Sequence, residues 1–338
     1  MQKNSLFFFI ILICLGSLLS NYKVFNANIK QYLIQNYLSE GEVANIELDY
    51  LNRISTKYPS LSSTVFPLKG ITGTYWLQND SILKGLDLLE QANKDNPYLG
   101  FPDAMIAQFY EFTGVKDSFN YYARKAYEKL PNAPQHYILI SKTLVNENRI
   151  DSLESFFNKT KEKVTDNQLF KIYFAAAIKN KEKFDSASLN QNIKFAKAAW
   201  PRQKDLRLLT DYLIFGEEKI KEIVYLQQMA IDSFELDPEF SIKTMENITT
   251  EISDNIYNYE ILFEMYFKNS NYEKVITLYN DLTKRNILNF NAVIVEFISI
   301  SYINTNNFTT GCSLAKVLNN YNYKLSQSLL LACNINQN

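Results

Sequence analysis

Residues 81–97 read SILKGLDLLEQANKDNP, and this stretch decides the fold. In a helix Gly85, Leu89 and Ala92 share one face, because they are spaced by four and three residues, and Pro97 would end that helix. The pattern returns at steps of 34 residues. The matching positions are Phe119, Ala123, Ala126 and Pro131, and then Leu153, Phe157, Thr160 and Thr165. The chain is therefore built from internal repeats.

A second helix precedes this one in each unit and keeps the same register. It carries a small residue followed three positions later by a larger one. These pairs are Gly73 and Trp76, Ala107 and Tyr110, Ser141 and Leu144, and Ala175 and Ile178. We expect the small residue to let the paired helix approach closely. Gly85 on that helix should accept alanine more readily than phenylalanine, since alanine favours a helix where there is room.

The 34-residue spacing resembles the tetratricopeptide repeat (TPR). This resemblance implies an all-α fold, an α-α superhelix or solenoid of antiparallel helix pairs. The repeat units are 66–99, 100–133, 134–167 and 168–201, with further units at 256–289 and about 292–325. The chain then divides into a signal peptide or membrane anchor at 1–24, a helical lead-in at 25–65, repeats at 66–201, an irregular helical segment at 202–255, and repeats with a capping helix at 256–338.

The N-terminal segment is short and hydrophobic. Residues 6–19 read LFFFIILICLGSLL without a charge, which is the length of a signal-peptide core and short for a spanning helix. We expect either cleavage near Ser17–Ser20 or an uncleaved anchor reaching about Val24. Lipidation at Cys14 or a buried N-terminal helix would also fit this segment. Export or anchoring places the rest of the chain in the periplasm or at the cell exterior.

Composition argues against most chemistry. The 338 residues hold 35 Lys+Arg against 36 Asp+Glu, so no broad charge favours nucleic acid. A single histidine, His136, excludes any mechanism that needs two, and we expect it to be a capping or surface residue. The phosphate-loop, dinucleotide and nucleophile-elbow motifs are missing, and the acidic pair Glu217-Glu218 suits the first turn of a helix. We expect a non-enzymatic protein without cofactor or metal.

The cysteines leave one question open. Cys312 falls on the second helix of the last unit and Cys333 on the expected capping helix. In an exported protein the two could form a disulfide, and the alternative is a pair of buried apolar residues.

A protein or peptide partner is expected on the concave face of the superhelix, which first helices would line. The register places ten residues near it: Gln108, Glu111, Ile138, Lys142, Val145, Ile172, Lys179, Glu260, Glu264 and Glu296. The two lysines make the middle of the groove positive and the three later glutamates make its C-terminal end negative, so a partner with separated acidic and basic segments would fit. If that contact fails, the irregular segment 202–255 is the other expected location.

A second resemblance covers residues 57–136, in the runs YPSLSSTVFPLKGITGTYWLQNDSILKGLDLLEQANKDNPYLGF and KDSFNYYARKAYEKLPNAPQH. These look like the repeat-bearing tails of bacterial O-antigen ligase-like membrane proteins, although the catalytic membrane part of such ligases is missing here. The resemblance implies an envelope context and carries over no catalytic residue. It gives an alternative function, an accessory factor in envelope polysaccharide assembly. The partner's identity and the oligomeric state are not written in the sequence.

Overall fold

A computed structural model describes residues 2–40, 61, 66–79, 81–163 and 167–335. The described residues form helices and no strand, apart from one isolated bridge between Leu61 and Pro67. The helices are α1 (Gln2–Glu40), α3 (Leu68–Gln78), α4 (Ile82–Asp95), α5 (Phe101–Phe112), α6 (Lys116–Lys129), α7 (Pro134–Asn146), α8 (Ile150–Thr160), α9 (Gln168–Lys179), α10 (Ser186–Ala199), α11 (Lys204–Phe215), α12 (Glu217–Ser233), α13 (Pro238–Glu251), α14 (Ile256–Lys268), α15 (Tyr272–Lys284), α16 (Ala292–Asn304), α17 (Phe308–Asn320) and α18 (Gln327–Cys333).

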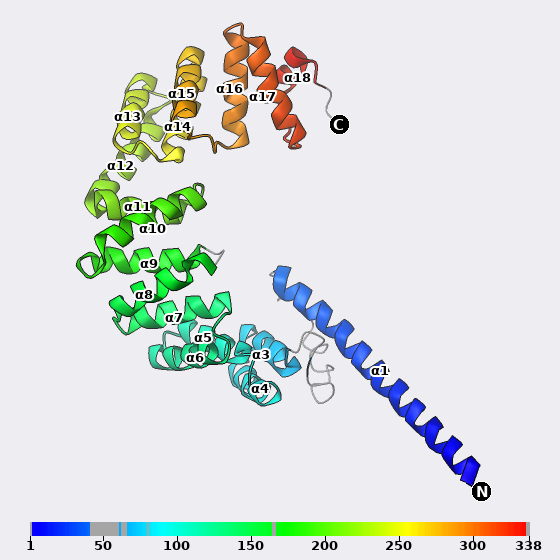
Figure 1. Cartoon of the computed structure of the whole chain (residues 1–338). Coiled ribbons are helices and arrows are strands. Elements are labelled where there is room, and N and C mark those ends of the chain that lie inside the picture. Colours follow the sequence, from blue (N-terminus) through cyan, green and yellow to red (C-terminus); the bar gives the residue numbers. More distant parts are fainter. Residues whose placement is uncertain (1, 41–60, 62–65, 80, 164–166, 336–338) are drawn as a thin grey trace. The chain divides into compact units, whose positions relative to one another are not determined.

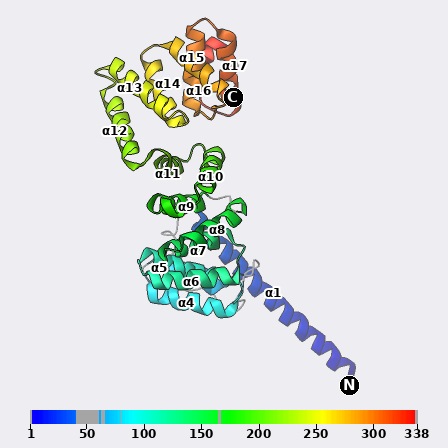
Figure 2. The same ribbon diagram turned by 60° about the vertical axis from the view of Figure 1, so that its left-hand side comes forward.

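The chain folds as two compact units, 1–176 (unit 1) and 177–338 (unit 2), with the boundary inside α9. In unit 1 the helices α3 to α8 stack as successive antiparallel pairs (Figures 1 and 2). In unit 2 the pairs α14/α15 and α16/α17 repeat the arrangement. The expected fold class, an all-α TPR-like array of helix pairs, is confirmed.

Aromatic side chains fill much of the core of unit 1. Phe157 of α8 and Tyr173 of α9 stack with ring centroids 3.9 Å apart, and both side chains are fully buried. Tyr127, Tyr137 and Phe156 form a second cluster of edge-on and tilted contacts. These aromatic side chains therefore pack in the interior of unit 1.

The first helix pair is packed more tightly than we expected from the sequence. A Cβ added to Gly85 would lie 2.7 Å from Cγ of Leu77 and 2.9 Å from the carbonyl oxygen of Gly73. The space that would make alanine favourable at this position does not exist, because the two backbones already touch.

The expected small-residue position fails in the fourth repeat. Ala175 is exposed, whereas Ala176 and Ala177 are buried. The helix α9 is therefore rotated about its axis relative to the first helices of the earlier repeats. The connection that follows also differs, because a 3₁₀ turn at Lys181–Lys183 separates α9 from α10 where the earlier pairs have a short loop.

Asparagine replaces glycine at several helix ends. Asn148 after α7 and Asn306 after α16 adopt the left-handed backbone conformation, with φ of 55° and 64°. The amide of Asn148 donates to the carbonyl of Val145, and the next amide, that of Arg149, donates to Leu144. Asparagine tolerates this conformation better than other residues with a Cβ. A chain with nine glycines can therefore still end its helices tightly.

The irregular segment 202–255 holds three helices, α11, α12 and α13. The helix α12 begins at Glu217 and carries Glu218 in its first turn, as expected from the acidic pair. Gly216 precedes it with φ of 89°, a conformation that favours glycine. Asp237 caps α13 by accepting a hydrogen bond from the amide of Phe240.

The N-terminal segment is one helix, α1, which continues beyond the expected limit at residue 24 to Glu40. Its stretch Phe8–Asn26 has a mean hydropathy of 1.8 and is, among the described residues, the helix long and apolar enough to cross a membrane. A signal sequence has the same length and composition. Residues 25–40 of the expected lead-in belong to α1, and most of 41–65 lies outside the described residues.

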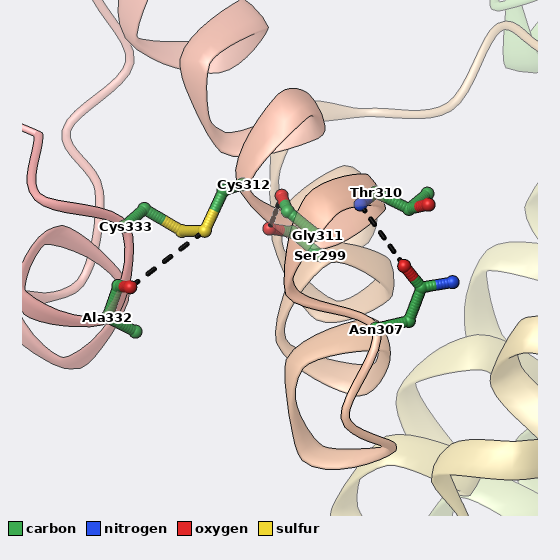
Figure 3. Close-up of a disulfide and its surroundings, with 7 residues drawn as sticks. All are labelled: Ser299, Asn307, Thr310, Gly311, Cys312, Ala332 and Cys333. Atoms are coloured by element: carbon green, nitrogen blue, oxygen red, sulfur yellow. Dashed lines mark hydrogen bonds between the residues drawn. A yellow bond between two sulfur atoms is a disulfide. The ribbon is translucent and has the colours of Figure 1, made fainter.

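A disulfide joins Cys312 of α17 to Cys333 of α18, with Cα atoms 5.2 Å apart (Figure 3). The short helix α18 packs Leu329 and Cys333 against Ala315 and Leu318 of α17. Of the two possibilities left open by the sequence, the structure shows the bonded pair.

Candidate interaction surfaces

A pocket of about 380 Å³ lies between the first helices α3 and α5 of unit 1. Its lining residues are Thr74, Leu77, Gln78, Met105, Gln108, Phe109 and Phe112. Gln108, one of the expected partner-binding residues, is half-buried at this pocket. Phe112 at the end of α5 is 91% exposed, which is unusual for an aromatic side chain outside an interface.

Two further expected residues pair with each other. The ammonium group of Lys142 on α7 lies 2.6 Å from a carboxylate oxygen of Glu111 on α5, and both side chains are partly exposed. An exposed pair of this kind contributes about 0–1 kcal/mol to stability. The charges of this face therefore remain close to solvent.

The other expected partner-binding residues on α7 and α9 differ in how far their side chains are exposed. Ile138 and Val145 on α7 and Ile172 on α9 are half-buried. Lys179, the last residue of α9, is exposed. Ile172 belongs to unit 1 and Lys179 to unit 2.

The three glutamates expected on one acidic surface have different environments. Glu260 on α14 is buried, forms an ion pair with Arg202 at 2.9 Å, and accepts a hydrogen bond from the amide of Asn291 at the start of α16. Glu264 is exposed and pairs with Lys268 one turn later.

Glu296 on α16 repeats the arrangement of Glu260. It is buried and accepts hydrogen bonds from the amide of Ser326, at the start of α18, and from the hydroxyl of Tyr323. In both cases a carboxylate on one helix holds the backbone at the beginning of the helix two places later, α16 for Glu260 and α18 for Glu296. Both carboxylates therefore have partners within the chain, and only Glu264 is presented to solvent.

A larger pocket, of about 630 Å³, lies within unit 2. The helices α11, α12, α14 and α16 contribute to its wall. Much of that wall is aliphatic, and Leu208, Val224 and Val293 are 39%, 48% and 45% exposed at it. Three partly exposed aliphatic side chains from three helices thus surround one hollow.

Two hydrogen-bond donors at this pocket have no partner. Arg207 is 7% exposed and its Nε makes no hydrogen bond, and Asn258 is 3% exposed and its Nδ2 makes none. The amide oxygen of Asn258 does accept a hydrogen bond from Gln227, at a long 3.3 Å. A buried donor without a partner costs about 1–3 kcal/mol. Such groups occur where a ligand or an ordered water completes the site.

The charges at this pocket are already compensated. Arg207 pairs with Asp254 at 3.3 Å, and Asp211 pairs with Lys197 at 2.9 Å. Burial raises the pKa of Asp211, and the positive charges of Lys197 and Arg207 oppose that rise. The remaining charged lining residues are Glu260 and Glu264, paired as described, and Lys204, whose ammonium group lies 5.1 Å from the ring centroid of Tyr257.

Of the two possibilities that the sequence left for His136, a capping or a surface residue, the structure shows a buried capping residue. Its side chain is 4% exposed, and Nδ1 donates a hydrogen bond of 2.9 Å to the carbonyl of Leu130 at the end of α6. Burial lowers the pKa of His136, although the bond to Leu130 and the charge of Asp103 act in the opposite direction. The histidine thus caps the preceding helix as a neutral ring.

Within the described part of the chain, no group of three or more His, Cys, Asp or Glu residues is placed to hold a metal ion. Neither Arg207 nor Asn258 was singled out by the sequence. Arg207 does not repeat at the 34-residue spacing, and a polar residue on a helix reads as solvent-exposed without its tertiary neighbours. For Arg207 the signal in the sequence was that segment 202–255 departs from the register, whereas Asn258 lies in the unit 256–289, which keeps the register.

No family model and no curated protein matches this chain. Among solved structures it is similar to the TPR domain of P58(IPK), with 10% sequence identity and a TM-score of 0.33. The superposition covers 91% of this chain and 96% of that chain.

Proposed function

We propose that this chain is a non-enzymatic scaffold for protein–protein interaction. The observation that carries the proposal is the first-helix face of unit 1, where the pocket at Gln108, the exposed ring of Phe112 and the Glu111–Lys142 pair lie on consecutive first helices. Apolar hollows beside accessible charge suit a peptide or partner helix. Stacked helix pairs offer such surfaces without any catalytic group.

The scaffold acts outside the cytoplasm, either exported or anchored through α1, facing the periplasm or the cell exterior. Two independent features support this part of the proposal. The stretch Phe8–Asn26 is apolar enough to insert in a membrane, and the Cys312–Cys333 disulfide suits an oxidising compartment. As an uncleaved anchor, α1 would also extend beyond the hydrocarbon core, since its 39 residues span about 58 Å against about 30 Å.

The partner carries separated acidic and basic segments. Within unit 1, Lys142 would attract an acidic segment. Within unit 2, Lys179 would attract an acidic segment and Glu264 a basic one. Exposed charges are screened over about 8 Å at physiological salt, so affinity should fall as salt rises.

The test is capture of a partner from envelope extract by the full chain in detergent. The double variant Lys142→Glu/Lys179→Glu should capture less, while its melting temperature stays close to that of the parent. Since Lys142→Glu also places two carboxylates together, the triple variant Glu111→Lys/Lys142→Glu/Lys179→Glu is the matched control, because it differs from the double variant only in restoring the internal ion pair. If the triple variant restores capture, Lys142 acts only through Glu111.

If the double variant still binds the partner, and if the affinity does not change with salt concentration, the contact lies elsewhere. The captured protein also separates the two functional classes. Co-purification of a glycan polymerase or ligase would favour the alternative, an accessory role in envelope polysaccharide assembly.

A further inference from the structure

We propose that the 630 Å³ pocket of unit 2 binds an internal, uncharged segment of a protein partner through one aliphatic side chain and its neighbouring backbone carbonyls. The inference rests on the proposed function, because it names the chemistry of the partner segment. The pocket is defined by its wall (Leu208, Ile220, Ile223, Val224, Ile252, Ile261, Val293 and Ile294) and by the two unpartnered donors.

The shape of the wall selects an aliphatic group. Leu208, Val224 and Val293 are each about half exposed around the hollow, while Ile220, Ile223 and Ile252 are almost fully buried behind them. Burying apolar surface is favourable by about 25 cal/mol per Å². A Leu, Ile or Val side chain placed in the pocket would cover the exposed aliphatic side chains and gain this energy.

The polar groups select a neutral acceptor rather than a charged one. Nε of Arg207 and Nδ2 of Asn258 are donors, so the ligand must supply acceptor atoms. The charge of Arg207 is already balanced by Asp254, and the acidic groups Asp211, Glu260 and Glu264 also belong to the lining. An additional carboxylate would add negative charge to a lining that already holds three carboxylates against Lys204 and Arg207, whereas a backbone carbonyl would satisfy the donors without adding charge.

Access to the amide of Asn258 requires a small rearrangement. Both donor nitrogens are buried, and Gln227 contacts Asn258 only through a 3.3 Å hydrogen bond to its amide oxygen. Gln227 is half-buried on α12 at the pocket wall, so its side chain can turn outward without disturbing the core. The ligand carbonyl then accepts from Nδ2 of Asn258, and a backbone amide of the ligand takes the place of Gln227 as donor to Oδ1 of Asn258.

The experiment selects ligands from a library of random short segments displayed between fixed flanks, so that no terminus is free, with the full chain in detergent as the bait. Selected segments are then made as peptides with acetylated and amidated ends, and their dissociation constants are measured by fluorescence anisotropy. We expect one position to be enriched in Leu, Ile or Val between uncharged neighbours.

Two adjacent residues on α12 give a matched pair of variants. Val224 lines the pocket and is 48% exposed, whereas Tyr225 is 68% exposed and does not line it. Val224→Glu should weaken binding about tenfold or more, because it desolvates a charge against the aliphatic side chain. Tyr225→Glu should leave the dissociation constant unchanged. Equal effects of the two variants would overturn the proposal.

Asn258→Asp tests the donor. It keeps the oxygen that accepts from Gln227 and removes Nδ2, so binding should weaken about fivefold to tenfold while the preference for an aliphatic residue persists. A melting temperature close to that of the parent would show that Asn258→Asp is folded. Unchanged affinity in the folded variant would contradict the role of Asn258. Tighter binding of the same peptides with a free C-terminal carboxylate would show that the acceptor is charged.

Failure of the pocket proposal can be distinguished from failure of the proposed scaffold function. If no segment is selected but a partner is captured through Lys142, the scaffold function holds and the role of this pocket is wrong. If the selected peptides bind equally well to Val224→Glu and are lost in Lys142→Glu, the binding face is that of unit 1.

Discussion

The carbonyl oxygens of Gly73 and Gly85 each lie within 3 Å of the place where a Cβ would stand on the other glycine, at 2.9 Å and 2.8 Å. The helices α3 and α4 are therefore as close as two backbones allow. The last repeat uses the same device once, because a Cβ on Gly311 of α17 would lie 2.7 Å from the carbonyl oxygen of Ser299 on α16. The hydroxyl of Ser299 in turn donates to the carbonyl of Gly311 at 2.7 Å (Figure 3).

Gly85→Ala should lower the free energy of unfolding by about 1–3 kcal/mol, the usual cost of overpacking, in spite of the better helix propensity of alanine. The added methyl group meets backbone and a branched side chain that cannot both move. Thermal melting followed by circular dichroism of the full chain in detergent measures the effect. Leu83→Ala on the same helix is the control, since Leu83 is 86% exposed. An unchanged melting temperature for Gly85→Ala would mean that the helices separate readily.

The sequence predicted the helix pairs and their register because both depend on local spacing. A period of 34 residues and small residues at Gly73 and Gly85 were enough to place α3 against α4. How tightly they pack was not predictable, since it depends on the backbone distance and on the rotamer of Leu77. The exposure of Ala175 was likewise not predictable, since it depends on how α9 is rotated about its axis.

Asn148→Ala should destabilise the chain by about 1 kcal/mol, because alanine is strained in the left-handed conformation that ends α7. Asn148→Gly is the matched variant and should be as stable as the parent or slightly more so, since glycine adopts this conformation without strain. Melting temperatures of the two variants decide the matter. Equal melting of the alanine and glycine variants would contradict the assigned helix end.

Loss of the Cys312–Cys333 disulfide should lower the free energy of unfolding by about 3 kcal/mol, as the chain-entropy account gives for a separation of 21 residues. The double variant Cys312→Ser/Cys333→Ser should match the parent in reductant. Denatured parent without reductant should show a single reactive thiol, that of Cys14. Cys14→Ser is the control and should melt like the parent, and three reactive thiols in the oxidised parent would rule the bond out.

His136 should make stability depend on pH. Its folded pKa lies below the unfolded value of about 6.5, so the unfolded chain binds the proton more tightly. Its contribution is present above about pH 6.5 and is lost as the pH falls from there through the lower folded pKa. His136→Asn retains a donor for Leu130 and does not titrate. When the pH is lowered from about 7.5 to 5.5, the melting temperature of the parent should fall further than that of this variant. If the two melting temperatures fall by the same amount, the assignment of His136 as a buried neutral ring is wrong.

The candidate sites were less predictable than the fold. The sequence grouped Glu260, Glu264 and Glu296 as one acidic surface, because their spacing places them on first helices. Whether a carboxylate on such a helix meets solvent or a backbone amide depends on the path of the chain into the next helix. That path brings Asn291 to Glu260 and Ser326 to Glu296, and neither contact follows from a helical repeat.

Substitutions of the buried and the exposed glutamates should therefore lower the free energy of unfolding by different amounts. Glu296→Ala leaves the amide of Ser326 and the hydroxyl of Tyr323 without their acceptor, and the loss of hydrogen bonds to a charged group should cost about 1.5–3 kcal/mol. Glu296→Gln retains one acceptor oxygen and should lose less. Glu264→Ala removes only an exposed pair with Lys268 and should change stability by less than about 0.5 kcal/mol.

Hydrogen exchange localises the effect of Glu296→Ala. Protection should fall in α18 while it persists in α14 and α15, because the acceptor that is lost hydrogen-bonds to Tyr323 and to the start of α18. The disulfide still joins Cys333 to α17, so α18 should open locally while its C-terminal end stays bonded to α17. If Glu264→Ala destabilises the chain as much as Glu296→Ala, or if protection falls evenly across unit 2, the two carboxylates do not differ in the way their contacts require.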